Sequence, residues 1–79
     1  MTITEAVLIR IEELLRERNM TKRQLIEKSA IPAGTMASLY KKLAKSINLV
    51  TLYALARGFD MKISEFVNHE AFLNVEVKP

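Results

Sequence analysis

The chain has 79 residues, 49% hydrophobic and 27% charged, a balance typical of a single folded domain rather than a disordered segment. It contains no cysteine, which excludes disulfides and thiolate metal sites, and no apolar run approaches the roughly 18 residues that span a bilayer. The formal net charge is +3, and most of the positive charge lies in the middle third of the sequence.

A first amphipathic helix is predicted after Thr4, which is a good N-cap residue. It should end near Arg18 and Asn19, because asparagine tolerates the left-handed conformation that closes helices. The opening residues contain no basic segment, so we expect no signal peptide. The apolar face of this helix comprises Val7, Leu8, Ile11, Leu14 and Leu15.

A second, short helix is predicted from Thr21 to about Ser29. Thr21 and Gln24 have the spacing of a capping box, in which each side chain satisfies a backbone N–H of the other residue. Met20 precedes the cap and is positioned to pack against Leu25.

A third helix is predicted over about 33–43, with Pro32 at its first position, where the missing N–H costs nothing. Its inward-pointing residues should be Met36, Leu39 and Leu43, and its outward-pointing residues Lys41 and Lys42.

After a connection over 44–47, Asn48 should cap a fourth helix. Gly58 should weaken that helix near its end. Residues 59–66 predict a short final helix and its lead-in. Five short helices with brief connections indicate an all-α orthogonal bundle. The predicted inner face of the fourth helix comprises Leu49, Leu52, Leu55 and Ala56.

The last eleven residues differ from the rest, so we expect a domain over 1–68 and a C-terminal tail over 69–79. Residues 74–77 alternate between apolar and polar, which is a weak strand signal. Two interpretations of the tail stay open, namely packing on the domain's own core and a dimer contact. Its apolar residues are Phe72, Leu73, Val75 and Val77.

Positive charge is concentrated between Arg18 and Lys45. This segment contains seven basic residues and a single acidic residue, Glu27, so its net charge is +6. The segments before and after carry −2 and −1. This concentration is typical of a phosphate-binding surface. The alternative is a solvated basic face without a partner.

In this arrangement, residues 7–67 resemble the lambda-repressor-like, Cro-type (XRE-type) helix-turn-helix domain. The resemblance rests first on MTKRQLIEKSAIP at 20–32 and AGTMASLY at 33–40, which follow the family's pattern through its second and third helices. Residues 49–52 and 59–66 resemble the start of its fourth helix and its closing segment.

The resemblance implies a five-helix fold whose second helix spans the DNA backbone and whose third helix lies in the major groove. For Tyr40, packing at the helix end is the alternative to a phosphate contact. The base-facing residues would be Pro32, Ala33, Gly34, Thr35, Ala37 and Ser38, and the phosphate-facing residues Thr21, Lys22, Arg23, Tyr40, Lys41, Lys42 and Lys45.

The chain departs from the family's pattern at several places. Lys22 stands where Gln is common, Lys42 where Gly is usual, and Ser46-Ile47 where Asn-Pro is common. No long polar side chain stands at the base-facing positions, although a bidentate contact supplies about 1–3 kcal/mol of base discrimination. We therefore expect binding led by phosphate contacts, with few base contacts.

These observations predict sequence-dependent binding of double-stranded DNA by a repressor-like transcriptional regulator, a cytoplasmic homodimer from a bacterium or phage. The alternative is a protein-interaction or antitoxin-like module that reuses the fold. His69 has no neighbouring metal ligands in the sequence and should lie at a helix end. We expect no enzymatic activity, cofactor, metal, membrane contact or small-molecule substrate.

Overall fold

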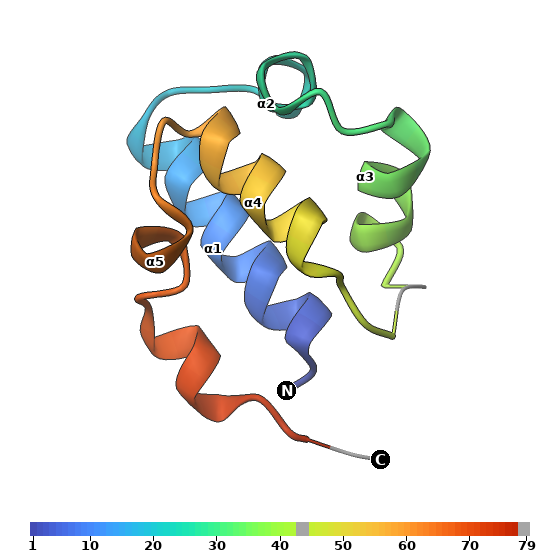
Figure 1. Ribbon diagram of the computed structural model, residues 1–79, viewed down its shortest axis with the longest axis vertical. Helices are drawn as coiled ribbons and strands as arrows, with labels where there is room; N and C mark the ends of the chain where they lie inside the picture. The colour runs from blue at the N-terminus through green and yellow to red at the C-terminus, as the bar shows by residue number, and fades with distance from the viewer. Residues whose placement is uncertain (43–44, 78–79) are drawn as a thin grey trace.

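The computed structural model describes residues 1–42 and 45–77, which form an all-helical bundle, as predicted (Figure 1). No strand occurs within these two ranges. The elements in chain order are α1 (Ile3–Glu17), α2 (Lys22–Ser29), α3 (Ala33–Tyr40), α4 (Leu49–Gly58), α5 (Ile63–Phe66) and the 3-10 helix η1 (Glu70–Asn74).

Helix α1 begins two residues earlier than predicted, because Thr2 and not Thr4 is its N-cap. The Thr2 hydroxyl accepts a hydrogen bond from the Glu5 N–H at 3.1 Å, and the Glu5 carboxylate accepts one from the Thr2 N–H at 3.0 Å. Val7 stands three residues after Thr4, so the same capping box cannot form there, and Thr4 is buried in α1. At the other end Asn19 has a φ of 53°, which confirms the predicted left-handed end.

The capping box at the start of α2 is confirmed. The Gln24 N–H donates to the Thr21 hydroxyl at 3.1 Å, and the Thr21 N–H donates to the Gln24 side chain at 2.8 Å. The helix ends at Ser29, as predicted, and Ala30 follows in a left-handed conformation with a φ of 60°.

Helix α3 is shorter than predicted and ends at Tyr40. Lys41 caps it, and Lys42 turns the chain away with a φ of 57°. Pro32 is the N-cap and not the first helical residue, because its ψ of 139° is extended. Met36 and Leu39 are buried as predicted, while the expectation for Leu43 falls outside the described residues.

Asn48 caps α4, as predicted, through a 2.8 Å hydrogen bond from the Thr51 N–H. Leu55 and Ala56 are fully buried, but the prediction for Leu49 is wrong, since this residue is 70% exposed. The helical spacing places Leu49 in line with Ala56, yet the elements that bury the end of α4 leave its first turn uncovered.

Gly58 is the last residue of α4 and lies at a close contact with α2. A β-carbon at Gly58 would lie 2.8 Å from Leu25 Cδ1 and 3.0 Å from Ser29 Cβ. Glycine is therefore the residue that lets the end of α4 reach α2 this closely.

The strand signalled over 74–77 is not formed: Asn74 is the last residue of η1, and 75–77 lie in neither a helix nor a strand. Ala71 is buried, and the ring of Phe72 lies 6.3 Å from that of Phe66, so this part of the tail packs on the domain's own core. The end of the tail runs beside the N-terminus, where the Glu76 N–H donates to the Met1 carbonyl at 2.9 Å (Figure 1). Leu73 is 84% exposed and Val77 95% exposed.

The described helices share one core around the stacked rings of Phe59 and Phe66, whose centroids are 6.4 Å apart. Arg10 fastens α5 to α1 by donating to the carbonyls of Phe66 at 2.8 Å and Glu65 at 3.0 Å. Within the described ranges, no helix has both the length and the apolar character needed to cross a membrane.

Candidate functional site

Helix α3 lies at the edge of the molecule and presents one face to solvent (Figure 1). The inner face is anchored by Met36 and Leu39, which are 3% and 2% exposed. The fold thus gathers on one short helix the residues that the sequence predicts to face bases. Of these, Thr35 and Ser38 are half-buried, and the exposed ones are Pro32, Ala33, Gly34 and Ala37.

The start of α3 offers backbone as well as side chains. Pro32 makes no side-chain hydrogen bond to the helix, so the first N–H groups of α3 have no side-chain cap. A β-carbon added at Gly34 would have no atom within 4 Å. This surface is therefore smooth, open and rich in small residues.

Thr35 and Ser38 border a small hollow between α3 and the start of α4. The far side of the hollow is formed by Ser46, Asn48 and Thr51. Hydroxyl and amide groups from two elements therefore meet directly beside the exposed face of α3.

The start of α2 is joined to the end of α3 through Lys22 and Tyr40. The Lys22 ammonium lies 4.0 Å from the centre of the Tyr40 ring, within the range of a cation–π interaction. The Tyr40 hydroxyl is buried and makes no hydrogen bond within the described residues. Burial and the nearby negative charge of Glu12 raise the pKa of Tyr40, so the phenol stays neutral. The ring, rather than the hydroxyl, is the part of Tyr40 that meets a cation.

Two cations of the basic segment make contacts with the loop that follows α4. Arg18 donates a hydrogen bond to the Phe59 carbonyl, and Lys28 forms a 3.7 Å ion pair with Asp60. Neither was among the predicted phosphate contacts. The predicted cations that remain exposed beside α2 and α3 are Lys22, Arg23, Lys41, Lys42 and Lys45.

Arg23 has a partner, but a weak one. Its guanidinium lies 3.4 Å from Glu27, and the two side chains are 89% and 66% exposed. Exposed pairs of this kind contribute only about 0–1 kcal/mol. Arg23 can therefore exchange Glu27 for a phosphate at small cost.

One surface was missed by the sequence reasoning. Leu49, Val50 and Tyr53 are exposed on α4 and, with Ile63 of α5, line an apolar groove. The sequence contained a sign of this surface. Positions 49, 50 and 53 lie on one side of the helix, and the buried residues Leu55 and Ala56 share only part of that side.

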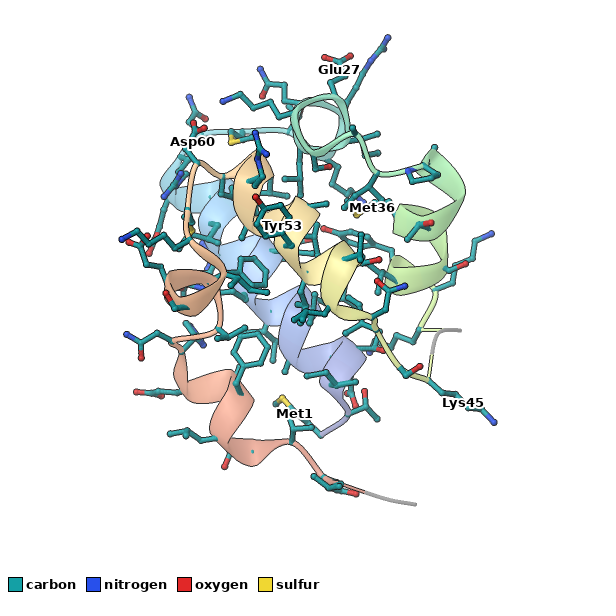
Figure 2. All side chains as sticks on the ribbon, in the orientation of Figure 1. Met1, Glu27, Met36, Lys45, Tyr53 and Asp60 are labelled. Carbon is teal, nitrogen blue, oxygen red and sulfur yellow. The ribbon has the colours of Figure 1, made fainter. Side chains whose placement is uncertain are left out.

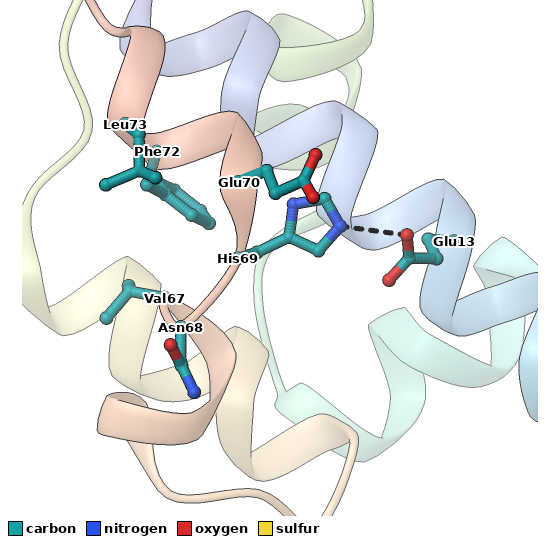
Figure 3. A pocket seen from close by; sticks show the side chains of 7 residues that line it. All are labelled: Glu13, Val67, Asn68, His69, Glu70, Phe72 and Leu73. Atoms are coloured by element: carbon teal, nitrogen blue, oxygen red, sulfur yellow. Dashed lines mark hydrogen bonds and ion pairs between the residues drawn. The ribbon is translucent and has the colours of Figure 1, made fainter.

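A hollow of about 610 Å³ lies between α1 and the tail (Figure 3). His69 crosses it: its Nε2 is 2.8 Å from a Glu13 carboxylate oxygen, and its Nδ1 accepts the Ala71 N–H at 3.0 Å. Because Nδ1 accepts, the ring proton lies on Nε2 and is donated to Glu13. His69 is thus the cap of η1 and a tie to α1, in agreement with its predicted place at a helix end.

Hydrogen bonds from His69 and then Arg10 lower the pKa of Glu13. Both ring nitrogens of His69 and the Glu13 carboxylate are therefore occupied by structural contacts. In the part of the chain that the structure describes, no three acidic or histidine side chains come together to hold a metal ion.

Comparison with protein families identifies a DNA-binding domain family. The sequence pattern of the Cro/C1-type HTH DNA-binding domain matches residues 10–71, a span that includes α2, α3, α4 and α5. No curated protein and no solved structure matches the chain significantly.

Proposed function

The chain belongs to the Cro/C1-type HTH DNA-binding domain family, and from this membership we propose that it binds double-stranded DNA as a repressor-like transcriptional regulator. The observation that carries the proposal is the exposed face of α3, bordered by cations that have no strong partner within the protein. A helix held by its inner face alone, with its outer face free, has the form needed to enter a major groove.

In this proposal α2 crosses the phosphate backbone at its first turn. Lys22 and Arg23 supply charge there, while Thr21 keeps the helix start in place through its capping box. The ring of Tyr40 limits the directions open to the Lys22 ammonium. Lys41, Lys42 and Lys45 would meet phosphates beyond the other end of α3.

Base recognition would depend on small groups. Ala33 and Ala37 can contact thymine methyl groups, and the Ser38 hydroxyl can exchange hydrogen bonds with a base edge. The open surface at Gly34 allows the backbone of α3 to approach the DNA closely. The lysine contacts give affinity without sequence information, so DNA shape would supply part of the specificity.

We further propose that the protein acts as a homodimer in the cytoplasm. One domain with a small recognition surface makes few base contacts, and two-fold pairing doubles them. The alternative function, a protein-interaction or antitoxin-like module, is favoured only if a partner protein binds while duplex DNA does not.

The test is the salt dependence of binding to a labelled duplex, preceded by selection from random sequences. Each phosphate contact should contribute about 0.9 to the negative slope of log K against log salt concentration. Lys22→Ala and Lys41→Ala should therefore each lower the slope by about 1 and weaken binding to all sequences alike.

Lys28→Ala is the matched control, because it removes the same charge from the last turn of α2, away from the first turn that would cross the phosphate backbone. Its slope should equal that of the unchanged protein. If no duplex is bound even near about 50 mM salt, where electrostatic binding is strong, the proposed function is wrong.

A further inference from the structure

Two neighbouring cations at the start of α2 are restrained in different ways. Arg23 lies 3.4 Å from the Glu27 carboxylate, and Figure 2 shows Glu27 on the outer side of α2, directed away from the rest of the bundle. Lys22 instead has its ammonium 4.0 Å from the centre of the Tyr40 ring. A carboxylate neutralises the cation that it restrains, whereas the face of an aromatic ring attracts a cation and leaves its full charge in place.

We propose that Tyr40 is a positioning residue for the contact between Lys22 and a DNA phosphate, a proposal that rests on the proposed function. In the free protein the ring holds the ammonium in one direction at the start of α2. An ammonium has three N–H donors, so one side of it can lie on the ring while the other side donates to phosphate oxygens. Tyr40 thus acts through Lys22 and does not itself touch the DNA.

The surroundings of Tyr40 fit this role. Its hydroxyl is buried and makes no hydrogen bond within the described residues, so the hydroxyl is not the group that meets a phosphate. The side chain is the last of α3 and packs against the hydrophobic core, which fixes the position of the ring. Tyr40 therefore offers Lys22 a fixed apolar face that belongs to a different helix.

The side chain of Lys22 is restrained without losing its charge. Glu12 borders the same hollow between α1 and the start of α2, yet the ion pairs found among the described residues do not include Lys22. Its backbone is fixed as well, because it follows the capping box of Thr21 and Gln24. Fewer conformations of the lysine then remain to be lost when a phosphate binds.

This role has a signature that can be measured. The charge of Lys22 does not depend on the ring, so removal of the ring should weaken binding without changing the number of counterions that binding releases. A cation–π contact at an exposed site corresponds to about a two- to fivefold change in an equilibrium constant. We expect a loss of this size for each bound copy and for all sequences alike.

The test is a double-mutant cycle measured on a selected duplex. Tyr40→Leu should weaken binding about two- to fivefold in the unchanged protein, and it should have no effect in a protein that carries Lys22→Ala. The slope of log K against log salt concentration should stay the same in Tyr40→Leu, since no charge is removed. Tyr40→Phe keeps the ring and should retain the affinity.

Arg23→Ala is the matched control, because it removes one positive charge from the next residue of α2, whose side chain is paired with Glu27. In that background Tyr40→Leu should weaken binding as much as it does in the unchanged protein. Urea denaturation checks that Tyr40→Leu folds. Tyr40→Met takes its place if it does not, since methionine adapts to irregular apolar space.

Proton NMR of the protein without DNA tests the contact itself. The ring current of Tyr40 should shift the ε-methylene protons of Lys22 upfield in the unchanged protein and in Tyr40→Phe. The shift should be absent in Tyr40→Leu.

The inference is overturned if the unchanged protein lacks the Lys22 shift, if Tyr40→Leu binds duplex as tightly as the unchanged protein, or if it loses the same factor in the Lys22→Ala background. The last two results retain duplex binding and so leave the proposed function standing. If the unchanged protein binds no duplex, the proposed function is wrong and the positioning role falls with it, even where the Lys22 shift shows that the ring contact exists.

Discussion

At the scale of single residues, Tyr40 combines a stacked cation with a buried hydroxyl that has no hydrogen-bond partner within the described residues. A buried polar group without a partner costs about 1–3 kcal/mol. Tyr40→Phe keeps the ring beneath Lys22 and removes this cost, so the free energy of unfolding should rise by about 1 kcal/mol. Urea denaturation measures the change.

Tyr53→Phe is the control for this prediction, because the Tyr53 side chain is exposed and its hydroxyl is free to contact water. It should leave the free energy of unfolding unchanged. The affinity of Tyr40→Phe for duplex DNA should equal that of the unchanged protein. A loss of affinity would mean that the hydroxyl reaches a phosphate, and the packing interpretation of Tyr40 would be wrong.

At the scale of the elements, the turn between α2 and α3 depends on a strained residue. Ala30 has a φ of 60°, a conformation that costs a residue with a β-carbon about 1–2 kcal/mol. Ala30→Gly removes this cost but raises the entropy of the unfolded chain, which opposes folding by about 0.4–1 kcal/mol. We expect a net gain of roughly 0.5 kcal/mol in the free energy of unfolding.

Ala37→Gly provides the comparison, since Ala37 is exposed within α3. Glycine in a helix interior costs about 1 kcal/mol relative to alanine, so this variant should be less stable. Thermal denaturation of the two variants should give opposite shifts. Equal destabilisation would contradict the strain assigned to Ala30.

The elements also show what a sequence can and cannot predict. Caps depend on neighbours three residues away, which is why Thr21 and Asn48 were predicted correctly. The same rule could have predicted Thr2 rather than Thr4 as the N-cap of α1, because of these two residues only Thr2 is followed by a glutamate three residues later. The close contact of Gly58 with α2 was not predicted, because it depends on Leu25 on another helix.

The exposed face of α3 could be predicted from the sequence, but the contacts between helices beside it could not. The spacing of Met36 and Leu39 fixes which face of α3 is buried, so the exposed residues follow. The contact between Lys22 and Tyr40 joins two helices through tertiary packing, which no local pattern encodes. The exposure of Leu49 has the same origin, since it depends on where the neighbouring elements stop.

At the scale of the whole molecule, Glu13 links α1 to the tail through His69 and to α5 through Arg10. Its lowered pKa means that folding favours the ionised carboxylate. The stability from this group is therefore fully present above the ordinary pKa of glutamate, about 4.3, and is lost as the pH falls through the lower pKa of the folded state.

Glu13→Gln should remove this dependence, since an amide does not titrate in this range. The unchanged protein should exceed the variant in urea midpoint at neutral pH, and the difference should shrink as the pH falls below about 4. Glu5, whose pKa is also lowered by the Thr2 N–H, leaves some acid sensitivity in both proteins. Parallel pH curves for the two proteins would show that Glu13 does not link the tail to α1 in this way.

Because the space around Gly34 is empty, side chains on the outer surface of α3 need not contact the rest of the fold. New side chains at Ala33, Gly34 or Ala37 would extend into solvent and leave the packing of Met36 and Leu39 unchanged. A family of variants could therefore differ in recognition while sharing one hydrophobic core. Substitutions on this surface could therefore change the DNA sequence that is recognised without changing the fold.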